Sequence, residues 1–267
     1  MAKLSISRAW DEARGTLSTN ASLLSTIGLA MFVLPGVIGE LVTPGAPEGQ
    51  LPPLGAWTIV TVIVVLIALV GQLAVIRLAI GARSTVGEAI GHAARRAPAY
   101  FAATLIWILP FLLVGAVLVG MIARNPASPP PAVILALFLL ACVMLFFAIR
   151  MLMTSAVASA ETHGPGGIIR RSWELTAGNF WRLLAFFILL IITLLVAAIA
   201  IGSIAGVIAA LLLGGNEPMT VGALFIALVT QLVSAAVSVV LMVMLARIYV
   251  QLAGDGAPEA SVPTSGT

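Results

Sequence analysis

The sequence predicts an all-α polytopic membrane protein with six transmembrane helices and three amphipathic helices on the cytoplasmic side. Its apolar runs reach the roughly 18–20 residues that a transmembrane helix needs. The 267 residues are 61% hydrophobic and 9% charged, with a mean hydropathy of +1.17, whereas soluble domains are about 25% charged. Lys and Arg also gather at alternate junctions between the runs, which is the pattern that sets membrane orientation.

The six predicted spans are apolar runs separated by short polar or proline-rich segments. They cover about Ala21–Val42, Leu54–Ile80, Tyr100–Ile122, Ala132–Arg150, Leu183–Leu213 and Met219–Ala246. Pro35 predicts a kink in the first span, because proline cannot donate a backbone hydrogen bond. The helix of the fourth span is expected to continue to Ala160 and to stop at Gly164–Gly167.

Three shorter segments predict helices that lie at the membrane surface. The first covers residues 5–17, with its apolar face formed by Ile6, Trp10, Ala13 and Leu17. The second begins at the capping box Thr85–Glu88 and carries His92, Arg95 and Arg96 on its polar face. The third covers about Ile168–Ala177, where Ile169, Trp173 and Thr176 share a side, and Gly178 is expected to follow its end.

Two patterns inside the last two spans predict contacts between helices. Ala198, Gly202, Gly206, Ala210 and Gly214 recur every four residues and favour close helix packing. Gln231 lies on a small, polar face of the sixth span, where an amide favours a hydrogen bond to a neighbouring helix. The single cysteine, Cys142, is expected to be a buried small hydrophobe, and it excludes an intramolecular disulfide.

The chain is predicted to be a triplication, with units of about 1–82, 83–163 and 164–253 followed by a disordered cytoplasmic tail, 254–267. Arg8, Trp10, Asp11 and Gly15 align in register with Arg171, Trp173, Glu174 and Gly178. Ile76-Arg77-Leu78, Ile149-Arg150-Met151 and Ala246-Arg247-Ile248 end the second span of each unit. The alternative is that short basic and aromatic matches arise by chance at membrane edges. Residues 1–253 form one membrane domain in either case.

The orientation follows from the basic residues. Of 13 Lys and Arg, 12 fall on the side of the N-terminus in this topology, and only Arg124 falls opposite. The positive-inside rule therefore places both termini in the cytoplasm and the protein in the cytoplasmic, or inner, membrane. The same bias explains the net charge of +3 without a nucleic-acid partner.

The segment Gly164-Pro165, Ile169-Arg170-Arg171-Ser172-Trp173-Glu174-Leu175-Thr176 and Gly178-Asn179-Phe180-Trp181-Arg182 resembles a known family. It is similar to the membrane domain fused to some bacterial glycerophosphodiester phosphodiesterases and to its free-standing relatives of unknown function. The stretch Gly81-Ala82-Arg83-Ser84-Thr85-Val86 is similar to the same family. The resemblance implies a multi-pass bacterial inner-membrane protein and does not imply catalysis. The fused phosphodiesterase is a soluble barrel with acidic metal ligands and catalytic histidines, for which this chain has no room.

The residues themselves predict no catalytic site, cofactor or metal. His92 and His163 lie far apart in no metal-ligand pattern, and no nucleophile, phosphate-loop or metalloprotease motif is present. Glu40, the acid nearest to a span interior, is expected at the membrane interface. The spans offer little beyond Gln72 and Gln231 for an ion pathway, although a carrier of a lipid or another hydrophobic solute needs no charged site.

The favoured function is therefore a non-enzymatic, lipid-interacting or envelope accessory component, with a membrane-protein partner or a homo-oligomer left open. The predicted contacts with lipid headgroups are the cytoplasm-side cations and tryptophans Trp10, Arg95, Arg96, Arg170, Arg171, Trp173, Trp181 and Arg182. The alternative is that these side chains only anchor the topology. Gly202, Gly206 and Gln231 are the predicted helix-packing residues.

Overall fold

The computed structural model describes residues 5–42, 55–81, 84–124, 128–212 and 220–254, and every regular element in them is a helix. The elements are α1 (Ile6–Thr19), α2 (Ala21–Gly28), the π-helical turn η1 (Leu29–Val33), α3 (Leu34–Val42), α4 (Ala56–Ile80), α5 (Val86–Ala123), α6 (Pro131–Arg150), α7 (Thr154–Ala160), α8 (Pro165–Thr176), α9 (Phe180–Leu212) and α10 (Val221–Ala253). Six of the described helical stretches are long and apolar enough to cross a membrane. The predicted all-α, six-span class is confirmed.

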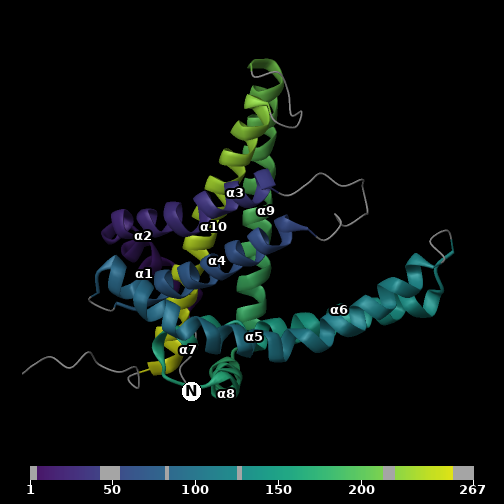
Figure 1. Cartoon of the computed structure of the whole chain (residues 1–267). Coiled ribbons are helices and arrows are strands. Elements are labelled where there is room, and N and C mark those ends of the chain that lie inside the picture. Colours follow the sequence, from purple (N-terminus) through teal and green to yellow (C-terminus); the bar gives the residue numbers. More distant parts are fainter. Residues whose placement is uncertain (1–4, 43–54, 82–83, 125–127, 213–219, 255–267) are drawn as a thin grey trace, which may run out of the picture.

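The helices form three pairs that diverge from a common base (Figure 1). The first span, made of α2, η1 and α3, packs with α4, while α5 packs with α6 and α9 with α10. The short helices α1, α7 and α8 lie at the base, where α7 contacts α4 and α5. The positions of the three pairs therefore depend on packing at the base.

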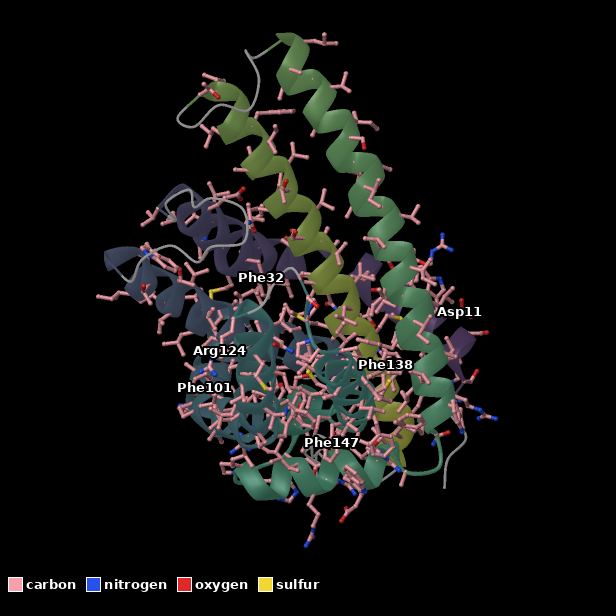
Figure 2. All side chains as sticks on the ribbon, turned by 90° about the vertical axis from the view of Figure 1, so that its right-hand side faces the viewer. Asp11, Phe32, Phe101, Arg124, Phe138 and Phe147 are labelled. Carbon is pink, nitrogen blue, oxygen red and sulfur yellow. The ribbon has the colours of Figure 1, made fainter. Side chains whose placement is uncertain are left out.

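The packed core lies at this base and not along the outer halves of the spans. Ile76, Ile149, Ile168 and Ile248, from four different helices, are fully buried there. By contrast, the outer half of α9 and α10 carries mainly carbon side chains that point away on all sides (Figure 2), and Leu211 is 77% exposed. Lipid tails are as apolar as leucine, so no hydrophobic force drives such surfaces together within a membrane.

The first span is interrupted just before Pro35. The N–H of Leu34 reaches back five residues to the carbonyl of Leu29, which widens the helix by one residue at this turn. Proline lacks an N–H and crowds the carbonyl of the residue four positions earlier, here Met31, and a widened turn relieves that conflict. The same turn lies close to α4, because a Cβ added at Gly71 would stand only 2.7 Å from Met31 Cβ.

The second predicted surface helix and the third span form one helix. The Thr85 capping box is confirmed, since Thr85 Oγ1 accepts from the Glu88 N–H at 3.3 Å and Glu88 Oε2 accepts from the Thr85 N–H at 2.8 Å. The helix then continues for 38 residues through Pro98 and Pro110. At 1.5 Å per residue it is about 57 Å long, so it reaches well beyond a hydrocarbon core of about 30 Å.

Pro165, the first residue of α8, has a role that the sequence did not predict. The fourth helical run ends at Ala160 as predicted, after a break at 151–153. Pro165, however, opens α8 instead of only stopping the preceding helix, because a proline at the first helical position loses no hydrogen bond. At the other end of α8, Gly178 has φ 80°, which confirms the predicted glycine after the helix end.

The faces that α1 and α8 bury overlap the predicted apolar faces only in part, at Ala13 and Thr176. Small side chains point inward, with Ala9 and Ala13 buried in α1 and Ser172 and Thr176 in α8. Trp10, which the sequence placed on the apolar face as a headgroup contact, is 51% exposed. Two helices approach closely only where side chains are small, so the bulky rings lie at the flanks. A hydrophobicity pattern does not distinguish these two roles.

The predicted small-residue stripe of the fifth span is not where α9 meets α10. A Cβ added at Gly202 or Gly206 would meet nothing within 4 Å among the described residues, and Gly214 lies outside them. Ala205 and Ala209, on the neighbouring face of α9, are buried instead. Gln231 does join two helices, because its Nε2 donates to Glu40 Oε2 of α3 at 3.2 Å.

Cys142 is exposed and not buried. It lies on α6, whose large apolar side chains are mostly exposed as well. The apolar run was therefore read correctly as a span, but the expected burial was wrong, because this helix contacts few other elements along its length. The predicted disordered tail lies outside the described residues beyond Gly254.

Candidate functional site at the base of the helix pairs

The predicted headgroup residues come from four helices, of which α5 and α8 contact each other at the base. Arg95 and Arg96 lie on α5, Arg170, Arg171 and Trp173 on α8, Trp181 and Arg182 in the first turn of α9, and Trp10 on α1. The helix α8 contacts α5, α6, α7 and α10. Its contact with α5 brings the predicted residues of these two helices to one region. Arg124 ends α5 far from this region, on the opposite side of the α9–α10 pair from Asp11 (Figure 2).

A partly buried carboxylate organises the centre of this region. Glu161 Oε1 accepts hydrogen bonds from Tyr249 Oη at 2.7 Å and from Arg171 Nε at 3.2 Å. Its Oε2 lies 2.8 Å from His163 Nε2. We call Glu161, His163, Arg171 and Tyr249 the Glu161 junction. It ties α10 and α8 to the loop that follows α7.

The junction keeps its central ion pair charged. Burial by itself raises the pKa of Glu161, but the hydrogen bonds from Tyr249 and Arg171 and the Arg171 charge outweigh it and lower that pKa below its ordinary value. Burial lowers the pKa of Arg171, and the hydrogen bond and charge of Glu161 outweigh it and raise that pKa. Each group therefore stabilises the charged form of the other.

Arg96 serves the same loop and does not face outward. Its Nε donates to the Ala158 carbonyl at 3.0 Å, and its Nη2 donates to the carbonyls of Glu161 and His163 at 2.7 Å each. Carbonyls at the C-terminal end of a helix have no partner within the helix. Arg96 satisfies these groups at the end of α7, so we assign it a structural role.

Arg150 and three aromatic rings form a second cluster, which the sequence did not predict. The Arg150 Cζ lies 4.8 Å from the centre of the Trp173 ring, 5.6 Å from Phe146 and 5.9 Å from Phe180, within the range of cation–π attraction. Its backbone carbonyl also accepts from Ser172 Oγ at 2.8 Å. Trp173 therefore holds α8 against the end of α6 and is not an isolated interfacial anchor.

The remaining side chains point outward. Arg95 and Arg182 are exposed, the Arg170 side chain is 84% exposed beside Glu174, and Trp181 is 78% exposed. We call Arg95, Arg170, Trp181 and Arg182 the outer rim. The predicted set thus divides into residues that build the base and residues that face its surroundings.

Trp10 belongs to neither group. It lies beside a groove of about 490 Å³ that Ser7, Asp11, Phe186 and Met244 also line. The groove separates α1 from α9 and α10. Among the described residues, no three His, Cys, Asp or Glu side chains come together in the way that holds a metal ion.

One family matches the sequence over this region. Its description is the membrane domain of glycerophosphoryl diester phosphodiesterase, and the match covers residues 128–262, about half of the chain. The chain belongs to this family. The matched range runs from α6 through α10 and includes the Glu161 junction, the Arg150 cluster and most of the outer rim. No curated protein and no solved structure matches the chain.

Membership of this membrane-domain family agrees with the six apolar helices and makes the chain a membrane protein. Sequence reasoning found the family, and it named all four outer-rim residues as candidate headgroup contacts. It missed the Glu161 junction because Tyr249 lies 88 residues from Glu161, and only the packing of α10 against α7 and α8 brings that hydroxyl group to Glu161, His163 and Arg171. The Arg150 cluster did have a signal in the sequence, because Arg150 ends a predicted span one helical turn after Phe146.

Proposed function

We propose that this protein is a non-enzymatic, multi-pass inner-membrane protein whose base lies at the cytoplasmic face and engages anionic lipid headgroups through the outer rim. The observation that carries the proposal is the exposure of Arg95, Arg170, Arg182 and Trp181 on one end of six apolar helices. Arg124 lies at the opposite end of its helix. This distribution supports cytoplasmic termini through the positive-inside rule.

The outer rim has the chemistry that such a surface needs. A basic side chain near an anionic membrane contributes about 1 kcal/mol, so three rim arginines contribute roughly 3 kcal/mol, a preference of about a hundredfold. Trp181 adds an amphipathic ring suited to the headgroup level. Arg96 and Arg171 are left out of this sum because their side chains are half-buried, whereas the three rim arginines are exposed.

We further propose that the base is built from three equivalent units. A buried pair of small side chains four residues apart occurs in each first helix, as Ala9 and Ala13, Ala89 and Ala93, and Ser172 and Thr176. The first helix of each unit packs on the second span of the unit before it, with α5 on α4 and α8 on α6. The order closes on itself, because α1 of the first unit packs on α10 of the third. This cyclic arrangement supports the triplication, because chance matches in sequence do not require equivalent packing.

The lipid proposal is tested with an outer-rim variant, R95Q/R170Q/R182Q, purified in mild detergent from a membrane that contains anionic lipid. We expect a clear loss of co-purifying anionic lipid. R124Q, at the far end of α5, removes one charge outside the rim and is expected to leave the lipid profile unchanged. An unchanged profile for the rim variant rejects lipid recognition and leaves these arginines as topology anchors.

The orientation is tested with fusions to reporters that are active only in the cytoplasm. Insertions at residues 90, 165 and 260 are expected to be active, and insertions at 48, 127 and 216 inactive. The reverse pattern contradicts the proposed orientation. The alternative function, transport of a lipid or hydrophobic solute, predicts movement of that solute across liposomes that contain the purified protein.

A further inference from the structure

Two adjoining spaces lie between the first helices of the chain and α10. The first is a polar space of about 300 Å³ at the base, lined by Glu12, Thr16, Asn20 and Arg247. The second is an apolar groove of about 380 Å³, whose walls include Leu24, Leu29, Val33, Ala236 and Val239. Together they combine a polar end with an apolar channel along a transmembrane helix.

The two spaces are lined by neighbouring residues of the same two walls. On one side, Thr16 and Asn20 of the polar space are followed directly by Leu17 and Ala21 of the groove. On α10, Arg247 lies seven residues from Val240, a spacing that places both on one helix face. One elongated molecule can therefore occupy both.

The charge of the polar space is set by Arg247. Its Nε donates to Thr16 Oγ1 at 2.9 Å, and among the described residues its terminal nitrogens have no recorded hydrogen-bond partner. The nearby carboxylate of Glu12 is paired with Arg8 Nε at 2.7 Å. The space therefore presents a positive, planar group with donors available to a phosphate.

We propose that one anionic phospholipid binds here, with its phosphate at Arg247 and an acyl chain in the groove between the first span and α10. The proposal rests on the proposed membrane orientation, which places Arg247 at the level of the cytoplasmic headgroups. The rim of the groove carries exposed apolar side chains, including Leu29 and Leu232. These face the hydrocarbon from which an acyl chain enters.

Two related places in the molecule lack this combination. The groove beside Trp10 shares Val240 with the proposed site, but its polar residues, Ser7, Asp11 and Thr193, include no cation that could pair with a phosphate. Arg150 occupies the position in α6 that corresponds to Arg247, and there the rings of Phe146, Trp173 and Phe180 surround the guanidinium. Only the Arg247 site joins a cation to an open apolar groove among these three.

The test uses native mass spectrometry of the full chain in detergent, titrated with phosphatidylglycerol or phosphatidylcholine of equal chain length. One tightly bound phosphatidylglycerol per chain is expected. R247Q is expected to weaken it about tenfold, as the loss of a charge-assisted hydrogen bond implies, and R247K to recover part of the affinity. R124Q serves as a control with the same change in net charge.

The groove is tested independently of Arg247. Ala236 is exposed and lines the groove, so A236F fills the space without entering the core and is expected to reduce binding of phosphatidylglycerol by tenfold or more. Inorganic phosphate alone is expected not to displace the lipid, because it leaves the groove empty. Tryptophan fluorescence during thermal unfolding checks that each variant is folded. If R247Q does not fold, the binding of phosphatidylglycerol by A236F tests the proposal instead.

Three outcomes overturn the proposal: wild-type binding by folded R247Q or by A236F, equal affinity for the two lipids, or displacement by inorganic phosphate, which indicates a free-anion site. The outer-rim variant R95Q/R170Q/R182Q separates this site from the proposed function. It is expected to lose loosely bound anionic lipid and to retain the single lipid. Loss of one class of lipid without the other shows which of the two proposals fails.

Discussion

Replacing Glu161 with glutamine is predicted to destabilise the base of the protein by about 2–3 kcal/mol at pH 7. The substitution keeps the size of the side chain but removes the charge that faces Arg171 and the acceptor strength that Tyr249 uses. Removing one partner of a fully buried ion pair costs about 3–5 kcal/mol. The side chains of Glu161 and Arg171 are 16% and 33% exposed, so solvent screening reduces that cost.

The measurement is equilibrium unfolding in mixed micelles, followed by tryptophan fluorescence, because Trp173 lies on α8 beside the junction. A double-mutant cycle with E161Q and R171Q isolates the pairwise contribution, and we expect a coupling of about 1.5–2 kcal/mol. R170Q is the matched control. It removes a neighbouring arginine whose side chain is 84% exposed, and we expect a change within about 0.5 kcal/mol.

This reasoning is refuted if E161Q unfolds at the same midpoint as the wild type, or if the coupling with Arg171 is below about 0.5 kcal/mol. Either result means that the carboxylate contributes no more than an exposed pair does. A large effect of R170Q equal to that of R171Q also contradicts it, because general charge on α8 then explains the loss.

Three further predictions follow from the described contacts. The pKa of Glu161 is lower in the folded protein than in the unfolded chain, so its stabilisation is complete above the unfolded pKa of about 4.5 and is lost as the pH falls through the lower folded value; unfolding of wild type and E161Q between pH 3 and 7 should converge at the acid end. G71A is expected to cost about 1–3 kcal/mol, because the new methyl group would lie 2.7 Å from Met31 Cβ, whereas G202A meets nothing within 4 Å and should be neutral or slightly stabilising; a comparison of the two unfolding curves checks this. R96Q is expected to increase proteolysis and hydrogen exchange of the loop after α7, since three carbonyls lose their donor, and an unchanged exchange pattern counts against the structural role of Arg96.

The positions of the helices were largely predictable because a membrane imposes its constraints locally. A span needs an uninterrupted apolar run of fixed length, and basic residues mark its cytoplasmic end. Both signals are read from consecutive residues, so the spans agreed with the structure to within a few residues at most ends. The main error was at α5, where the sequence predicted a surface helix followed by a separate span from Tyr100, whereas the structure has one continuous helix from Val86 to Ala123.

Contacts between helices were less predictable, because apolar side chains that face lipid and those that face protein look alike in sequence. The glycine stripe of α9 illustrates this, since a Cβ added at Gly202 or Gly206 would meet no atom within 4 Å in the described part of the chain, while Ala205 and Ala209 are buried. Trp10 and Trp173 were both predicted to contact lipid headgroups, but Trp10 is 51% exposed whereas Trp173 packs on the guanidinium of Arg150. On α8, the small polar side chains of Ser172 and Thr176 are buried at the base alongside Ile168.

The sequence by itself determined the class of the protein, the number of spans and the family, because composition, run length and a contiguous Arg-Trp segment carry that information. Only the tertiary structure decided which cations build the base and which remain outside it. Arg96 and Arg170 look equivalent in sequence, yet one binds three carbonyls and the other is exposed. That difference depends on Ala158, Glu161 and His163, more than 60 residues from Arg96, and no local pattern encodes a contact across such a distance.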